Sequence, residues 1–227
     1  MSIPSAGPRF LYLHGFASGP QSAKAVALAK HYEAKGIALE RLDLRVPSLE
    51  NLSLSAGLQT VGAAIGPQDD GRQRVVLFGS SLGGHMAALK AAEDPRVCAL
   101  VLLAPAFDLV HRWRQRLGEA GWQRWEASGW LAIDDWVTRQ KTRLSFDFTR
   151  DAAAVEARLG GWPDVRVPTL IVHGVHDDTV AIAGSRAWAA GKRHVRLVEV
   201  DDGHELTASL GRITAEADAH LASFLGG

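Results

Sequence analysis

The sequence predicts an α/β protein built on one mostly parallel sheet of about six strands, with helices on both of its faces. Short apolar, β-prone runs alternate along the chain with segments of helical length and spacing. Strands joined in this way require right-handed crossovers, which cover both faces of a parallel sheet. A serine flanked by glycines, at the junction of one such strand and the next helix, is the second observation that favours this class.

The elements of the sheet can be placed in order along the chain. The predicted strands are the apolar runs at 9–13, 37–44, 74–78, 97–103, 169–172 and 195–200. The predicted helices show the apolar spacing of a helix face and lie at 22–35, 52–65, 81–93, 182–190 and 205–225. Gly36 ends the first helix, and Gly79 marks the exit from the third strand. No flexible linker or internal repeat divides the chain, so a single domain over 1–227 is expected.

One interval interrupts the alternation, between the fourth and fifth predicted strands. We expect a small helical cap over 108–166, inserted into the main domain. Five tryptophans of this interval lie among polar residues at helical spacing: Trp113, Trp122, Trp125, Trp130 and Trp136. Each ring has two interpretations, since it either contacts the substrate or only seals the cap against the main domain.

Composition and charge narrow the class of partner. Lysine plus arginine total 25, as do aspartate plus glutamate, so no basic excess exists to attract nucleic acid or anionic lipid. No apolar run is long enough to span a bilayer, and residues 1–8 lack the pattern of a signal segment. The single cysteine, Cys98, lies in an apolar run and is expected to be a small buried side chain. We therefore expect a cytoplasmic protein that acts on a small molecule, with no nucleic acid or membrane partner.

Residues 79–83 read Gly-Ser-Ser-Leu-Gly, which matches the G-x-S-x-G pattern of a nucleophile elbow. The pattern stands directly after an apolar strand and directly before a helix, and this context gives it meaning. The sharp turn holds the serine in a strained backbone conformation, which requires almost no side chain at Gly79 and Gly83. Ser81 is therefore the predicted nucleophile, because Ser80 would lie one residue too early.

A serine hydroxyl needs a base that is largely neutral near pH 7, and histidine meets that need. The last predicted strand is followed by residues 201–204, Asp-Asp-Gly-His, so His204 is the predicted base. The preceding strand leads into a loop with two candidate acids, Asp177 and Asp178. Along the chain the candidates follow one another as serine, aspartate and histidine. This is the order found in parallel α/β folds that carry a nucleophile elbow.

The other histidines have structural interpretations. His85 lies four residues beyond Ser81 on the same predicted helix and is expected to pack beneath the cap or the elbow. His14 and His173 each end a strand as a His-Gly pair, where side-chain hydrogen bonds can hold the following loop. The histidines in polar helices and loops are expected to be solvated; they are His31, His111, His194 and His220.

Acyl transfer also requires donors for the developing oxyanion, and backbone N–H groups at a helix N-terminus can supply them. Leu82, which follows Ser81, is predicted to provide one donor. The second is expected from the loop after the first strand, where Gly15 allows a close approach. Phe16 is the predicted donor there, ahead of Ala17.

With these motifs in place, the chain resembles the α/β-hydrolase superfamily over essentially its whole length, without the leading antiparallel strands of larger members. Stretches within 11–25 and at 79–84 look like those of small bacterial esterases. The stretch at 173–180 is similar to that of a mitochondrial palmitoyl-protein thioesterase. The resemblance implies activity on carboxylic esters or thioesters. Its His-Gly-x-x-Asp-x-x-Val-Pro pattern selects Asp177 as the acid, although Ala181 stands where proline is common.

We therefore predict a serine hydrolase that cleaves a carboxylic ester or thioester through an acyl-enzyme on Ser81. His204 would deprotonate Ser81 while Asp177 orients the imidazole, and the N–H groups of Phe16 and Leu82 would stabilise the oxyanion. Two alternatives remain: the same triad acting on an amide or a carbon–carbon bond, and a catalytically silent relative that binds a ligand. The sequence holds no metal-ligand cluster, phosphate loop or dinucleotide fingerprint, so we expect no cofactor and no metal. The acyl group, the leaving group and the oligomeric state stay open.

Overall fold

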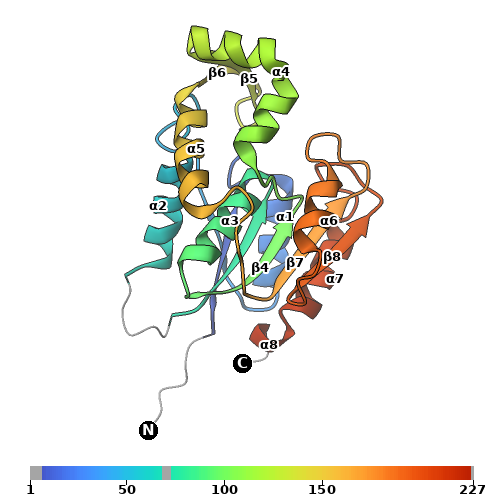
Figure 1. Ribbon diagram of the computed structural model, residues 1–227. Helices are drawn as coiled ribbons and strands as arrows, with labels where there is room; N and C mark the ends of the chain where they lie inside the picture. The colour runs from blue at the N-terminus through green and yellow to red at the C-terminus, as the bar shows by residue number, and fades with distance from the viewer. Residues whose placement is uncertain (1–6, 68–72, 226–227) are drawn as a thin grey trace.

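The centre of the protein is a six-stranded parallel sheet (Figure 1), seen in a computed structural model that describes residues 7–67 and 73–225. The strand order is β2–β1–β3–β4–β7–β8, and every neighbouring pair runs parallel. The strands are β1 Arg9–Leu13, β2 Leu39–Leu42, β3 Val75–Ser80, β4 Val97–Leu103, β7 Thr169–Gly174 and β8 Val195–Val200. The predicted fold class is confirmed. Residues 1–6, in which the sequence predicts no signal segment, lie outside the described residues.

Helices cover both faces of this sheet. Those of the main domain are α1 Ala23–Glu33, α2 Leu54–Ile65, α3 Leu82–Glu93, α6 Ile182–Ala189, α7 Leu210–His220 and α8 Ala222–Leu225. In β3, Val75 and Leu77 belong to the apolar cluster with α2, α3 and α6, whereas Val76 and Phe78 belong to the cluster with α1 and α7. All four side chains are fully buried. Burial on both faces explains why this strand reads as an unbroken apolar run.

The last helix begins later than the sequence predicts. Residues 205–209 stay in the loop that carries His204, and α7 starts only at Leu210. The carboxylate of Asp202 accepts a hydrogen bond from the N–H of Ser209 at 3.0 Å, and Leu206 has a φ of 54°. These features interrupt helical geometry. The loop around His204 is therefore longer and more closely tied than a helix starting at 205 would allow.

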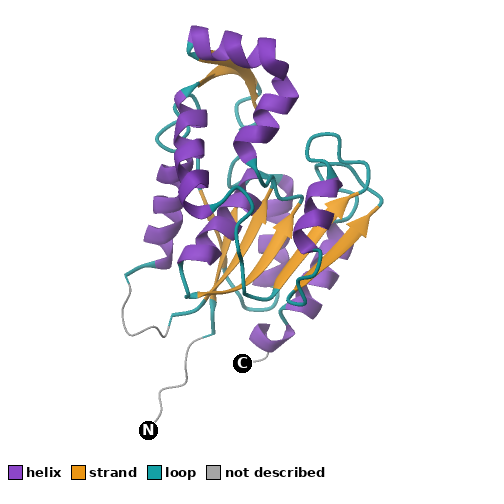
Figure 2. Ribbon diagram, in the orientation of Figure 1, coloured by secondary structure: helices purple, strands orange, loops and turns teal. Residues whose placement is uncertain are grey.

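The insertion between β4 and β7 lies above the carboxyl ends of the strands (Figure 2). It begins with α4 (Leu109–Ser128), which kinks at Gly118, and ends with α5 (Asp147–Leu159). Between the two helices lies an antiparallel hairpin formed by β5 (Trp130–Asp135) and β6 (Gln140–Ser145). The inserted segment, called the cap below, thus contains two helices and also a hairpin that the sequence did not predict.

The hairpin turn lacks the residues by which hairpins are usually found in a sequence. Residues 136–139 are Trp-Val-Thr-Arg, and Arg139 takes a φ of 62°, a conformation that favours glycine or asparagine. The carboxylate of Asp135 stabilises the turn, because it accepts hydrogen bonds from the N–H groups of Val137 at 2.9 Å and Thr138 at 3.4 Å. It also pairs with Arg45 at 2.7 Å. Hydrogen bonds and an ion pair from Asp135 therefore stabilise a turn whose own residues do not favour it.

The cap has its own aromatic core. Trp125 is buried and donates from its indole N–H to the carbonyl oxygen of Leu144 at 3.0 Å. Its ring lies 5.4 Å from that of Phe146, which also contacts Trp122 at 5.3 Å. Trp136, in contrast, is 59% exposed. Of the two interpretations of the cap tryptophans, packing therefore describes Trp122 and Trp125.

Candidate active site

Ser81 lies at the sharp turn between β3 and α3. Its φ of 54° and ψ of −116° are strained for a residue with a side chain, as a nucleophile elbow requires. A Cβ at Gly79 would collide with the carbonyl oxygen of Gly83, and a Cβ at Gly83 would collide with that of Leu13. Both positions therefore need glycine. The N–H of Ser81 donates to the carbonyl oxygen of Leu103 at 2.9 Å, which fixes the turn to β4.

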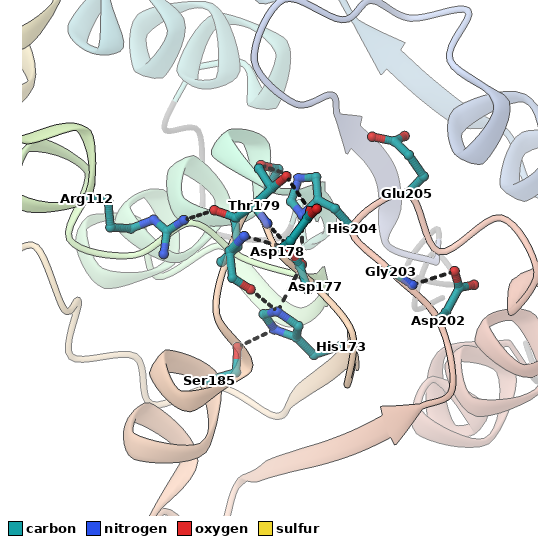
Figure 3. A network of polar contacts seen from close by, with 12 residues as sticks. Arg112, His173, Asp177, Asp178, Thr179, Ser185, Asp202, Gly203, His204 and Glu205 are labelled. Carbon is teal, nitrogen blue, oxygen red and sulfur yellow. Dashed lines mark hydrogen bonds and ion pairs between the residues drawn. The ribbon is translucent and has the colours of Figure 1, made fainter. Parts of the chain in front are cut away.

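His204 lies within hydrogen-bonding distance of both other predicted catalytic side chains. His204 Nε2 is 3.1 Å from Ser81 Oγ, and His204 Nδ1 is 2.7 Å from Asp177 Oδ2. When Nδ1 carries the proton that faces the carboxylate, Nε2 is free to accept the serine proton. The three residues come from the ends of β3, β7 and β8, which meet at the same edge of the sheet; Figure 3 shows Asp177 and His204 facing each other.

Asp177 is held as a carboxylate. Its Oδ1 accepts from the N–H groups of Thr179 at 2.9 Å and Val180 at 2.6 Å, while its Oδ2 faces His204 and also His173 Nε2 at 3.2 Å. Burial alone would raise the pKa of Asp177. The hydrogen bonds from His173, His204 and Val180 outweigh that effect and hold the pKa well below its ordinary value. The group is therefore ionised at neutral pH, as the partner of an imidazolium must be.

Asp178, the second candidate acid, is exposed and directed elsewhere. Its carboxylate accepts a hydrogen bond from the Thr179 hydroxyl at 3.2 Å and makes no contact with His204. The geometry thus favours Asp177 between the two.

His173 lies closer to the site than the sequence indicates. Its Nε2 is 2.8 Å from the carbonyl oxygen of Val180 and 3.2 Å from Asp177 Oδ2, so this nitrogen carries the proton. Its Nδ1 then accepts from the Ser185 hydroxyl at 2.8 Å. As expected, the side chain of His173 thus forms hydrogen bonds that fix the loop after β7. The contact with Asp177 was not predicted, although the spacing of four residues between the two side chains in one strand-end loop was a usable signal.

The loop after β1 reaches the nucleophile. A Cβ at Gly15 would lie 3.3 Å from Ser81 Cβ, so the backbone at this point is in contact with the elbow. Within the described residues, no protein acceptor occupies the N–H of Phe16 or that of Leu82. Ala17 follows with a φ of 53°. Leu82 directly follows Ser81 and Phe16 directly follows Gly15, so both residues adjoin the elbow, and neither backbone N–H is taken by a protein acceptor in the described part of the chain.

His14 fixes the loop after β1. Its Nε2 accepts from the N–H of Leu44 at 2.9 Å, so Nδ1 carries the proton and donates to the carbonyl oxygen of Gly15 at 2.9 Å. Burial lowers the pKa of His14. The neutral imidazole thus links β1 to the segment after β2, as the sequence-based structural interpretation implied.

Lys24 stabilises the loop that carries His204. Its ammonium group donates to the carbonyl oxygen of Glu205 at 2.8 Å and lies 3.4 Å from that of His204. The side chain is buried on α1, and burial lowers its pKa. Sequence reasoning assigned no role to Lys24, which appeared only inside the stretch that looks like small bacterial esterases.

The cap contacts two of the loops that surround Ser81. At the loop after β1, the ring of Trp113 packs edge-on against Phe16 at 5.3 Å, and the backbone N–H of Trp136 donates to the carbonyl oxygen of Ala17 at 3.1 Å. On the acid side, Arg112 Nη2 donates to the carbonyl oxygen of Thr179 at 2.6 Å (Figure 3). Residues of α4 and of the hairpin turn therefore contact the loop after β1 and the loop after β7.

The histidines outside the site fall into two groups. His85 is fully buried, with Nε2 3.2 Å from Glu156 Oε1 of the cap, as its placement beneath the cap implies. His31 and His194 are not simply solvated. His31 pairs with Asp218 at 3.0 Å, and His194 Nε2 lies 2.8 Å from the carbonyl oxygen of Val165.

Three further observations concern metal sites, membrane-spanning helices and pockets. Over residues 7–67 and 73–225, no group of three or more histidine, cysteine, aspartate or glutamate side chains is arranged to hold a metal ion. The helices in this part of the chain are all too short or too polar to cross a membrane. A hollow of about 630 Å³ contains none of Ser81, Asp177 and His204; it is lined by residues of the β5–β6 hairpin and of the segment before α2, which are Trp130, Lys141, Thr142 and Arg143 with Glu50 and Asn51.

The sheet order and the strained serine turn define the class: the protein has the α/β-hydrolase fold. Mouse α/β hydrolase domain-containing protein 10 is 20% identical, with a TM-score of 0.78 over 97% of this chain and 92% of the mouse chain. Est1E of Butyrivibrio proteoclasticus, solved with ferulic acid bound, is 22% identical, with a TM-score of 0.77 over 99% and 92% of the two chains. At these identities the likeness concerns the fold.

The chain belongs to the uncharacterised protein family UPF0227, whose family model matches residues 9–215. A curated relative, the 20-hydroxy-prefusarin hydrolase of Gibberella moniliformis, is 30% identical over 143 residues. That match covers 60% of this chain and 32% of the relative. The chain spans about a third of the length of the curated relatives it matches.

Proposed function

We propose that the protein is a serine hydrolase that cleaves a carboxylic ester or thioester. The observation that carries the proposal is the hydrogen-bonded series from Ser81 through His204 to Asp177, with distances of 3.1 and 2.7 Å. A serine held at an elbow, a base within reach of its hydroxyl and a carboxylate that orients the base are the parts that acyl transfer through a serine requires.

In the proposed mechanism, Nε2 of His204 takes the proton of the Ser81 hydroxyl as Oγ attacks the substrate carbonyl carbon. The ionised Asp177 stabilises the imidazolium that forms. The negatively charged oxygen of the tetrahedral intermediate accepts hydrogen bonds from the N–H groups of Phe16 and Leu82. The intermediate collapses as the imidazolium gives its proton to the departing alcohol or thiol, which leaves an acyl-enzyme.

Water completes the cycle. His204 removes a proton from a water molecule, whose oxygen attacks the acyl carbonyl carbon of the acyl-enzyme. Collapse of the second tetrahedral intermediate releases the carboxylic acid and returns the proton to Ser81 Oγ. In this proposal the chain works as one domain over 1–227, with 108–166 as a cap that shapes the acyl site.

Two further facts support an ester or thioester. The curated relative named above is a hydrolase, and Est1E holds ferulic acid, a carboxylic acid of the kind that ester cleavage releases. Amide and carbon–carbon bond cleavage would use the same side chains, so a substrate survey must include them.

The decisive experiment compares Ser81→Ala with Ser80→Ala. We expect Ser81→Ala to lower kcat for p-nitrophenyl esters and acyl thioesters by at least about 1,000-fold and to abolish labelling by a fluorophosphonate. Ser80→Ala is the matched control, since its hydroxyl lies one residue before the elbow, and should keep both activities. Hydrolysis that survives in Ser81→Ala would refute the mechanism. A parent protein that binds a ligand but turns over no ester, thioester or amide would identify a silent relative.

A further inference from the structure

Arg112 is a cation beside the proposed reaction centre. It lies near the start of α4 and extends toward the loop that carries Asp177 (Figure 3). Its Nη2 donates to the carbonyl oxygen of Thr179 at 2.6 Å, and the N–H of Thr179 donates to Asp177 Oδ1 at 2.9 Å. The guanidinium is therefore two hydrogen bonds away from the acid of the proposed triad.

Most of the hydrogen-bonding capacity of this guanidinium is unused. A guanidinium has five N–H donors, and the carbonyl of Thr179 takes one. Within 7–67 and 73–225, no carboxylate lies at ion-pair distance from Arg112, and Asp177 and Asp108 attract it only from farther away. The side chain is half-buried, and burial lowers its pKa. A partly buried charge without an oppositely charged partner raises the free energy of the folded protein, unless an anion binds to it.

The position of Arg112 relates it to a substrate. Its neighbour Trp113 packs on Phe16 in the oxyanion loop, whereas Arg112 itself contacts the acid loop. The start of α4 thus contacts both loops that adjoin the proposed catalytic residues, and we expect a substrate bound at Ser81 to lie beside it. Arg116, one turn farther along α4, adds positive charge near Arg112. Together they favour an anion in this space.

From this arrangement we propose that Arg112 binds an anionic oxygen group of the substrate, of which a carboxylate is the simplest form. The enzyme then prefers esters or thioesters that carry a negative charge in the acyl part or in the leaving group. A guanidinium suits this task because its planar donors match the oxygens of a carboxylate in pairs. The inference deepens the proposed function and rests on it, since it describes what the same site selects.

The test uses two pairs of substrates that differ in one charge. For the acyl part, mono-p-nitrophenyl glutarate is compared with p-nitrophenyl pentanoate, which has the same chain length. For the leaving group, 4-acetoxybenzoate is compared with its methyl ester. We expect the parent to have the higher kcat/KM for the charged member of at least one pair, and we expect salt to reduce that preference.

The variants assign the preference to one side chain. Arg112→Gln should lower kcat/KM for the charged member of that pair by about 10- to 100-fold and change the neutral member by less than about 3-fold. Arg112→Lys should keep part of the preference, because it keeps the charge but loses the planar fork. Arg114→Gln is the matched control on the same helix, since Arg114 is exposed and already paired with Glu119 at 3.0 Å, and should change nothing.

Two results would overturn the inference. One is a parent enzyme without preference in either pair, which needs no variant. The other is an equal fall on charged and neutral substrates in Arg112→Gln, which would make Arg112 only a support of the acid loop. Neither result would contradict the proposed function. That proposal is contradicted by a different result, namely that Ser81→Ala still hydrolyses the neutral esters.

Discussion

The ammonium group of Lys24 donates a hydrogen bond to the backbone carbonyl oxygen of Glu205 at 2.8 Å. Glu205 directly follows His204, whose own carbonyl oxygen lies 3.4 Å from the same nitrogen. Lys24 stands on α1, which follows the oxyanion loop in the chain. A buried cation thus ties the element after the oxyanion loop to the backbone of the proposed base.

Lys24→Met should therefore impair orientation of the base more than substrate binding. We expect kcat for an activated ester to fall by about 10-fold or more with KM changed by less than about 3-fold, because small displacements of a catalytic group are costly. Lys24→Arg, which restores a cation, should recover part of the rate. Lys30→Met changes an exposed lysine on the same helix and should match the parent. Parent-like kcat in Lys24→Met would show that the loop keeps its shape unaided.

The two neighbouring acids offer a direct comparison. Asp177→Asn should reduce kcat by about 1,000- to 10,000-fold, because an amide cannot hold the required tautomer or stabilise the imidazolium. Asp178→Asn should stay within about 3-fold of the parent, since its exposed carboxylate contacts Thr179 and not His204. Steady-state kinetics with one ester checks both. Equal losses would transfer the role, in whole or in part, to Asp178.

The sequence was sufficient where a structural feature depends on neighbouring residues. The unbroken apolar run of β3 predicts a strand buried on both faces, and the glycines around Ser81 predict the turn that follows it. The positions of Asp177 and His204 could be predicted because each loop directly follows a strand of a parallel sheet. Carboxyl ends of parallel strands meet at one edge, so the topology alone brings these loops together.

The sequence was insufficient where a contact joins distant parts of the chain. Lys24 and Glu205 are 181 residues apart, and Arg112 and Thr179 are 67 residues apart. No local sequence pattern predicts either contact. The β5–β6 hairpin could not be predicted for a related reason. Its turn has Arg139 where a glycine would signal a hairpin, and Asp135 with Arg45 stabilises it from outside the turn.

Asp177 also makes stability depend on pH. Burial would raise its pKa, but the hydrogen bonds from His173, His204 and Val180 prevail and hold the pKa of the folded state well below the ordinary value of about 3.9. As pH falls below about 5, the unfolded chain therefore binds this proton first. The stabilisation is complete above that range and is lost as pH falls toward the folded-state pKa, at about 1.4 kcal/mol for each unit of pKa difference.

Urea unfolding between about pH 7 and about pH 3 tests this linkage. The free energy of unfolding of the parent should fall more steeply on acidification than that of Asp177→Asn, whose amide does not titrate. Asp178→Asn is the control and should keep the parent's slope, because Asp178 is exposed. The same acid slope in all three proteins would mean that other carboxyl groups dominate acid unfolding.

The last prediction separates packing from specificity among the cap tryptophans. Trp125 is buried in the cap core, so Trp125→Ala should lower the free energy of unfolding by about 3–5 kcal/mol. Trp136 is 59% exposed at the hairpin turn, and its backbone N–H donates to the carbonyl oxygen of Ala17, the residue after Phe16. Because this bond holds the backbone of Trp136 at the proposed oxyanion loop, we expect its exposed ring to cover an apolar acyl chain while contributing little to the chemistry at Ser81.

Trp136→Ala should therefore keep the stability of the parent and turn over an acetyl ester within about 3-fold of it, while its preference shifts toward shorter acyl chains. A series of p-nitrophenyl esters from acetate to dodecanoate measures this shift as kcat/KM against chain length. Trp130→Ala is the control, because Trp130 lies at the opposite end of β5, with its ring under the guanidinium of Arg143 at 3.9 Å. A chain-length profile unchanged in Trp136→Ala would place the acyl site away from the hairpin, and the search would move to the Asp43 to Pro47 loop.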